Sequence, residues 1–210
     1  MISVATPEHL GLIGDILAEG GRSGSWDASL GQGGANLDAL LTKLRYALIH
    51  GVLPQVDPRT GQRIETRIGG YVFHVRPDTP PIGFGLFKDF TATGHELWLV
   101  GIAGHHRGQG HGRALVTELL ATPFGNRVEL ARCAWASEGP RRCSRVLCAH
   151  GFARRRATSK EEWLLHSRAP ASVVQMVTTM DMSPYEPRRG AGGRAPASLP
   201  PGVGRTVTRQ

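Results

Sequence analysis

Apolar residues in the first fifty positions repeat with the spacing of two amphipathic helices. A short apolar run at residues 2–5 precedes them and predicts a strand. Thr6-Pro7 supplies an N-cap and a proline suited to the first helical turn, and a glycine pair at 20–21 ends this helix. Asn36 caps the second helix and Gly51 ends it. The apolar stripes consist of Leu10, Ile13 and Leu17 in the first helix and of Leu37, Leu40, Leu41, Leu44 and Leu48 in the second.

The middle of the chain contains short apolar runs separated by turn residues, which is typical of strands. Three candidate strands, at 71–75, 82–87 and 96–102, are joined by short turns, so a meander of antiparallel strands is the simplest interpretation. Residues 58–70 are predicted to form a loop. A glycine-rich turn at 104–112 leads into a helix with apolar residues at 115, 116, 119 and 120.

The pattern continues with a fifth strand at 128–135, a short helix at 141–150 and a last pair of strands near 152–158 and 161–167. The sequence therefore predicts an α/β (α+β) fold. We expect a mixed, mostly antiparallel sheet of six to seven strands, flanked by helices.

The C-terminal part of the chain differs from the rest in composition. We expect a folded domain over residues 1–168 and a flexible tail, rich in Pro, Gly and Arg, over residues 169–210. Residues 173–182 are apolar enough to form a short docked segment within that tail.

Composition changes this picture only through charge. The net charge is +8, and 25 residues are Lys or Arg. Seven of these basic residues lie between Arg141 and Lys160 with no acid among them, so a nucleic-acid partner is an alternative to consider. Three cysteines without metal-ligand spacing suit a reducing compartment. No apolar run is long enough for a membrane span and no secretory signal is visible, so we expect a cytoplasmic protein without a membrane partner.

The most informative segment is the strand at 96–102 and the turn and helix that follow it. Glycines at alternate positions (Gly108, Gly110 and Gly112) let backbone N–H groups converge, and a helix N-terminus adds a partial positive charge. These features predict a cradle for a phosphate or pyrophosphate. The lysine of a P-loop is missing, and the spacing does not fit the Gly-x-Gly-x-x-Gly of a dinucleotide-binding turn.

The segment Arg107-Gly108-Gln109-Gly110-His111-Gly112 resembles the Arg/Gln-x-x-Gly-x-Gly/Ala signature of the GNAT superfamily of N-acetyltransferases. A strand, a short helix and His150-Gly151-Phe152 follow in the order that is similar to this family. The resemblance implies a GNAT fold whose fourth and fifth strands, at 96–102 and 128–135, splay apart. It also implies acetyl-CoA as co-substrate. The cofactor-binding residues it implies are Val100, Gly101 and Ile102 for the pantetheine arm, and Arg107, Gly108, Gln109, Gly110, His111, Gly112 and Arg113 for the pyrophosphate.

The resemblance further implies transfer of an acetyl group to a primary amine, which must first lose a proton. Glu96 lies six residues before Ile102, close to where histone acetyltransferases of this superfamily carry their general base. Strand alternation would place Glu96 on one face with Trp98, Val100 and Ile102. The alternative is that Glu96 is a solvated acid at a strand end.

The chain departs from the family at the general acid. The position that often carries a Tyr, four residues before Gly151, is Leu147, and a position that often carries an Asn is Pro140. Ser144 or Cys148 could supply a proton, or both could be packed helix residues. The acid therefore stays unassigned.

An acetyl-CoA-dependent N-acetyltransferase is thus the first interpretation. A catalytically inactive acetyl-CoA-binding GNAT module and a basic nucleic-acid-binding module are the alternatives. No metal site is expected, because His105, His106 and His111 lack ligand spacing. The acceptor amine is not encoded in any motif; its pocket is expected from residues 20–35 and 52–70, and a homodimer is left open.

Overall fold

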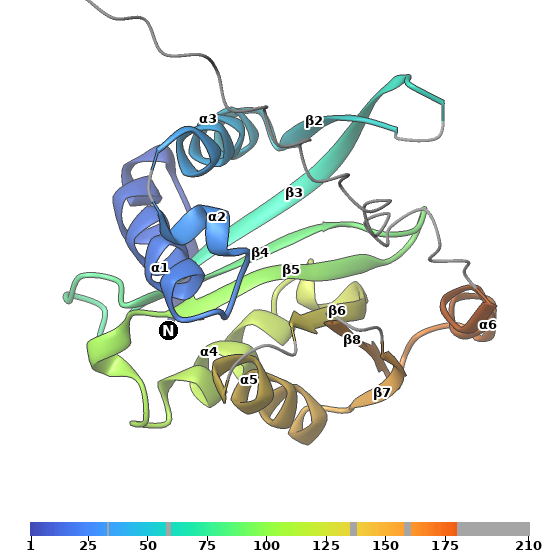
Figure 1. The fold of residues 1–210 in the computed structure, drawn as a ribbon. Helices are drawn as coiled ribbons and strands as arrows, with labels where there is room; N and C mark the ends of the chain where they lie inside the picture. Colours follow the sequence, from blue (N-terminus) through green and yellow to red (C-terminus); the bar gives the residue numbers. More distant parts are fainter. Residues whose placement is uncertain (33, 58–59, 135–137, 158–160, 180–210) are drawn as a thin grey trace, which may run out of the picture. The chain divides into compact units, whose positions relative to one another are not determined.

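A computed structural model describes residues 1–32, 34–57, 60–134, 138–157 and 161–179. The strands are β1 (Ile2–Val4), β2 (Val52–Val56), β3 (Arg63–Phe73), β4 (Gly83–Asp89), β5 (His95–Ile102), β6 (Val128–Ala134), β7 (Phe152–Ala157) and β8 (Glu161–His166). The helices are α1 (Leu10–Arg22), α2 (Ala28–Gly31), α3 (Ala35–His50), α4 (His111–Leu120), α5 (Glu138–Ala149) and α6 (Ala171–Thr179) (Figure 1).

The strands form a mixed, mostly antiparallel sheet in the order β1-β3-β4-β5-β6-β8-β7, with β2 paired to β3 outside this path. The predicted fold class is confirmed, although the sheet has eight strands among the described residues instead of six or seven. The additional strand comes from a hairpin of β2 and the first half of β3, where the sequence predicted a loop over 58–70. Ile64, Thr66 and Ile68 alternate with charged residues in the first half of β3. Residues Val52–Val56 of β2 pair antiparallel with residues 63–67.

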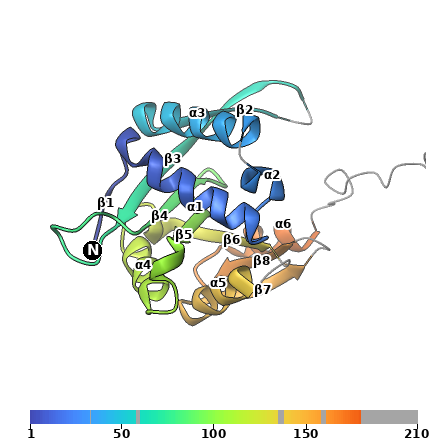
Figure 2. The same ribbon diagram turned by 60° about the vertical axis from the view of Figure 1, so that its left-hand side comes forward.

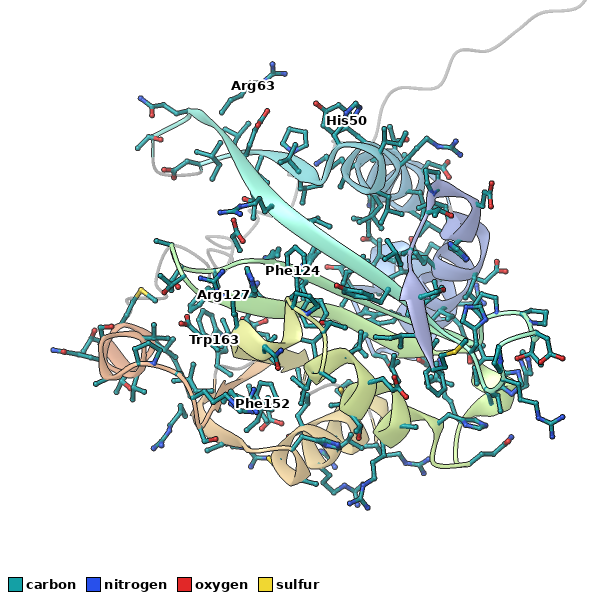
Figure 3. The ribbon with its side chains drawn as sticks, turned by 180° about the vertical axis from the view of Figure 1, so that it is seen from behind. His50, Arg63, Phe124, Arg127, Phe152 and Trp163 are labelled. Carbon is teal, nitrogen blue, oxygen red and sulfur yellow. The ribbon has the colours of Figure 1, made fainter. Side chains whose placement is uncertain are left out.

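Helices cover both faces of the sheet (Figures 1 and 2). On one face, Ile13 of α1 and Leu44 of α3 pack with Phe84 and Leu86 of β4. The other face buries apolar residues of α4 and α5 against β3, β4 and β5: Phe73, Phe87, Leu97, Leu115, Leu119 and Leu147. Phe124, which follows α4, stacks on Phe87 with ring centroids 6.1 Å apart (Figure 3). These two apolar layers fix β5 from both sides.

The parallel pair β5–β6 separates after a few residues. Its ladder runs from His95–Val128 to Leu97–Ala131 and goes no further, whereas β5 continues to Ile102. The predicted splay between the fourth and fifth strands of the sequence pattern is therefore present between β5 and β6. Over its second half, one edge of β5 has no ladder to β6.

A β-bulge lies at the same point of β5. Leu86 of β4 pairs with Leu99, and the next residue, Phe87, pairs with Leu97, so Trp98 has no partner opposite it. The extra residue reverses the alternation of side chains along β5. Glu96 and Trp98 therefore share one face, and Val100 and Ile102 lie on the other, with the core under α4.

The compact unit extends beyond the predicted boundary at residue 168. It spans Met1–Thr179 and includes α6, whose Val173 and Val177 are buried. The Arg156 Nη1 group of β7 donates a hydrogen bond to the Val177 carbonyl at 3.0 Å. The remainder of the expected tail, residues 180–210, lies outside the described residues. Across the described ranges, no helix combines the length and the apolar character that a membrane span requires.

Candidate functional site

The candidate site lies where β6 leaves β5. β5 and β6 run parallel, and each is followed by a helix, α4 or α5. The N-termini of both helices therefore lie at the same end of the sheet, next to the separated strands (Figure 1). This arrangement brings together the second half of β5, the glycine loop and the first turn of α4.

The glycine loop at 108–112 is open on the side where side chains would stand. Gly108 and Gly110 have φ of +79° and +86°, conformations that favour glycine over residues with a Cβ. Gly112, the second residue of α4, has no positive φ. A Cβ at any of the three would have no atom within 4 Å. Neither backbone conformation nor packing in the fold therefore requires glycine at position 112.

The first turn of α4 suits an anion. Gly110 is its N-cap and supplies no side chain to cap the N–H groups of the first turn. Arg113 stands exposed in the same turn. The helix dipole and Arg113 both favour negative charge at this position. The structure thus places the predicted loop residues in an open cradle with donors at its base.

Two of the predicted cofactor residues have their side chains engaged within the turn itself. Arg107 Nε donates to the Ile102 carbonyl at 2.9 Å, and its Nη1 lies 3.1 Å from Glu19 Oε1 of α1. Gln109 Nε2 donates to the His105 carbonyl at 3.2 Å. In this geometry both side chains brace the loop.

Residues 100–102 of β5 divide between its two edges. The Ala103 N–H donates to the Ile82 carbonyl at 2.9 Å, so it points toward the strand before β5 in the sequence. By alternation, Gly101 points the same way, whereas Val100 and Ile102 present their backbone groups to the edge from which β6 has separated. The Ile102 carbonyl on this edge is the one that accepts the Arg107 hydrogen bond.

Three histidines lie beside the loop. The rings of His105 and His106 have centroids 4.1 Å apart, and those of His106 and His111 are 6.1 Å apart. Partial burial and the two neighbouring imidazoles lower the pKa of His106. Within the part of the chain that the structure describes, no group of three His, Cys, Asp or Glu side chains is arranged to hold a metal ion.

Glu96 is buried on the face of β5 opposite to Val100 and Ile102, with 2% of its surface exposed. Arg132 of β6 binds its carboxylate with two hydrogen bonds, from Nε to Oε1 at 2.8 Å and from Nη2 to Oε2 at 3.2 Å. The Lys88 Nζ group of β4 lies 3.2 Å from Oε2. The interpretation of Glu96 as a solvated acid is therefore wrong. Two cations compensate its buried charge.

The two cations of this cluster, Lys88 and Arg132, also lie over aromatic rings. Lys88 Nζ lies 5.1 Å from the centre of the Trp98 ring, and the Arg132 guanidinium lies 5.3 Å from that of Trp163. Trp163 of β8 (Figure 3) donates its indole N–H to Glu161 at 2.8 Å. Burial lowers the pKa of Lys88, although the Glu96 carboxylate acts in the opposite direction.

The expected common face for Glu96, Trp98, Val100 and Ile102 is wrong. The bulge at Trp98 leaves only Trp98 on the side of Glu96 and moves Val100 and Ile102 to the α4 side. Sequence reasoning also missed Lys88 and Arg132. A basic residue inside a mostly apolar strand, as Arg132 is in Val128–Ala134, was the available signal.

Trp26 is a further residue that sequence reasoning did not single out. Its ring lies close to Gly101 of β5: a Cβ placed on Gly101 would lie 3.0 Å from the indole. It comes from the predicted acceptor segment 20–35. Ile68, from the second predicted segment 52–70, packs in a cluster with Trp98.

The positions considered for the general acid are divided between core and surface. Leu147 and Ser144 are 1% and 2% exposed, and Cys148 is exposed. Cys143 accepts a hydrogen bond from the Cys133 thiol, which raises the pKa of Cys133 and lowers that of Cys143. Because Ser144 is almost fully buried, it is a packed helix residue, whereas Cys148 lies at the surface.

Residues 46–138 match the model of the Acetyltransferase (GNAT) family. Over these residues the chain is therefore similar to the GNAT acetyltransferase family. No curated protein matches the chain.

Solved structures share the fold at low sequence identity. An acetyltransferase from Thermus thermophilus is 19% identical, with a TM-score of 0.51, covering 79% of this chain and 95% of its own. A ribosomal-protein-alanine N-acetyltransferase from Brucella melitensis is 16% identical, with a TM-score of 0.54 and coverage of 79% and 98%. The paia N-acetyltransferase from Thermoplasma acidophilum in complex with coenzyme A is 14% identical, with a TM-score of 0.51 and coverage of 79% and 97%.

Proposed function

We propose that the domain transfers an acetyl group from acetyl-CoA to a primary amine. The observation that carries this proposal is the open loop at Gly112. The fold gives no reason for glycine there, whereas close approach of a pyrophosphate to the α4 N-terminus does. The family match and the coenzyme A complex of the Thermoplasma acidophilum relative support the same ligand.

The residues present fit such a cofactor. Val100 and Ile102 would bind the pantetheine arm along the edge of β5 left by β6, in the manner of an added strand. Gly108, Gly110 and Gly112 would contact the pyrophosphate with Arg113 adding charge. Bound acetyl-CoA supplies an acyl group activated as a thioester.

Amine acetylation needs a base, since an ordinary primary amine is almost fully protonated at pH 7. We propose Glu96 as the catalytic carboxylate. Arg132 contacts both of its oxygens and Lys88 contacts Oε2, so uptake of a proton by Glu96 would weaken these ion pairs. The backbone N–H near Ile102 is the proposed oxyanion donor. The coenzyme thiolate can depart without a strong acid near neutral pH, because an ordinary thiol has a pKa of about 8.5.

Calorimetric titration with acetyl-CoA, followed by thiol-release assays with a panel of amines, tests the function. The proposal expects one saturable site and thiol release with at least one amine class. Absence of acetyl-CoA binding by a folded protein would overturn it. Binding without thiol release across small amines, peptide N-termini, lysine peptides and aminoacyl-tRNA would assign the domain to non-catalytic acetyl-CoA binding.

A further inference from the structure

We infer that Glu19 of α1 is a positioning residue for the cofactor loop. This inference rests on the proposed acetyl-CoA site. It concerns a side chain that belongs to neither the loop nor the strands, and that lies 85 residues before Gly104 in the sequence.

Glu19 holds the turn between β5 and α4 at two points. Its Oε2 accepts a hydrogen bond from the Gly104 N–H at 3.1 Å, and its Oε1 lies 3.1 Å from Arg107 Nη1. Arg107 in turn donates from Nε to the Ile102 carbonyl at 2.9 Å. Glu19, Gly104 and Arg107 are called the Glu19 clamp below. The clamp ties the end of β5, the start of the turn and the residue before the glycine loop to one carboxylate.

Gly104 shows that the carboxylate is closely fitted into the turn. A Cβ at this position would overlap Glu19 Oε1, so a side chain on residue 104 would displace Glu19 from its present position. Gly104 has no positive φ, so backbone conformation does not require glycine there. The close approach of Glu19 thus fits a residue without a side chain at position 104.

The loop beyond the clamp has few other restraints. Gly108 follows Arg107 directly and Gly110 comes two residues later, and both lie in the left-handed region with no atom near the position of a Cβ. Between them, Gln109 adds one hydrogen bond to the His105 carbonyl. Glycine is the most flexible residue, so the direction in which the loop leaves Arg107 depends on how Arg107 is held. The clamp thus sets the position of the N–H groups that would contact the pyrophosphate.

The charge of Glu19 gives a test that separates positioning from electrostatics. A carboxylate near a pyrophosphate repels it, so simple removal of the charge would strengthen anion binding. Its ion-pair partner Arg107 and the loop residue Arg113 both keep their charge in a Glu19 variant. Positioning predicts the opposite sign, because a loosened loop binds the anion less well.

The experiment compares Glu19→Ala, Glu19→Gln and the control Asp15→Ala by calorimetric titration with acetyl-CoA. Asp15 lies on the same helix, one turn earlier, and is exposed. Loss of hydrogen bonds to a charged group predicts roughly tenfold weaker binding, or more, for Glu19→Ala. Glu19→Gln keeps an acceptor for Gly104 and should lose less, and Asp15→Ala should match wild type. With an amine acceptor, KM for acetyl-CoA should rise in Glu19→Ala while kcat at saturation holds.

Hydrogen exchange of the free protein separates failure of the inference from failure of the proposed function. Amides of residues 104–112 should exchange faster in Glu19→Ala than in wild type or Asp15→Ala, with melting temperatures compared for all variants. Equal or tighter acetyl-CoA binding by Glu19→Ala, or unchanged exchange, would overturn the inference. If wild-type protein does not bind acetyl-CoA, the proposed function fails, and the exchange rates alone decide whether Glu19 positions the loop.

Discussion

Glu96 illustrates how single residues are placed by charge in this domain. Its carboxylate is buried among strands, and such a group is stable only because Arg132 and Lys88 reach it from the two neighbouring strands. The same contacts constrain its chemistry, since a proton on the Glu96 carboxylate would weaken its ion pairs with Arg132 and Lys88. Glu19 is placed by the same logic on the opposite end of β5, with a backbone N–H and a guanidinium as partners.

Replacing Glu96 by Gln tests its catalytic role. Gln keeps the shape and one acceptor oxygen but takes no proton at neutral pH, so turnover should fall by roughly 10²–10⁴-fold. Acetyl-CoA affinity should hold because the loop is unchanged. The rate loss should shrink as the pH approaches the pKa of the acceptor amine, about 10.4 for a lysine-like amine. Steady-state rates against pH for both forms provide the measurement.

Stability must be measured alongside these rates. Removing one partner of a buried ion pair costs roughly 3–5 kcal/mol, although Lys88 and Arg132 keep some contact with solvent. Rates are therefore compared at temperatures at which both proteins are folded. Wild-type turnover of Glu96→Gln at pH 7 would show that another group takes the proton.

At the scale of secondary structure, the sequence predicted most elements and the antiparallel meander of β3, β4 and β5, but it did not predict the β2–β3 hairpin. The glycine loop and α4 followed from local signals, because glycines, caps and apolar periods act over a few residues. The splay between β5 and β6 was expected only from the family resemblance. The β2–β3 hairpin escaped because Pro54 and several charged residues resemble a loop. Its strands are stabilised by pairing with each other, which is not visible in either segment alone.

Part of the candidate site could likewise be predicted from the sequence and part could not. The residues of the loop were predictable, since adjacent glycines and a helix start define a phosphate cradle in one segment. The bulge at Trp98 was not, because it depends on the register between β4 and β5, and it moved Val100 and Ile102 to the other face. Lys88, Arg132 and Glu19 come together only through tertiary contacts. The sequence pattern within one element does not show which residues of other elements it will contact.

At the scale of the whole domain, buried histidines link folding to pH. His166 is 6% exposed, and its Nδ1 accepts the Arg168 N–H at 3.1 Å, so a proton on Nδ1 would break this bond. Burial, followed by the nearby Arg168 charge, lowers the pKa of His166. Burial likewise lowers the pKa of His95. Both rings therefore favour the neutral form in the folded state.

A lowered histidine pKa means that the unfolded chain binds more protons than the folded domain just below pH 6.5. The free energy of unfolding should therefore rise with pH through this range and level off above it. His166→Asn keeps an acceptor for Arg168 but does not titrate, so its stability should depend less on pH. Denaturant unfolding from pH 5 to 8 measures both slopes. A slope identical to wild type in His166→Asn would contradict the assignment.

The central claim is that the loop before α4 is an open cradle for the pyrophosphate of acetyl-CoA, and Gly112 tests it most directly. Gly110→Ala would strain the backbone, because residue 110 has φ of +86°. Ala at position 112 has room and an ordinary φ, so Gly112→Ala should leave the melting temperature equal or slightly higher.

The decisive measurement is the dissociation constant of acetyl-CoA for Gly112→Ala, taken beside wild type with the melting temperature of each. The account predicts that the folded variant binds acetyl-CoA at least about tenfold more weakly, since the new methyl group holds the pyrophosphate away from N–H donors whose hydrogen bonds to a charged group are each worth roughly 1.5–3 kcal/mol. A folded variant with wild-type affinity would contradict it.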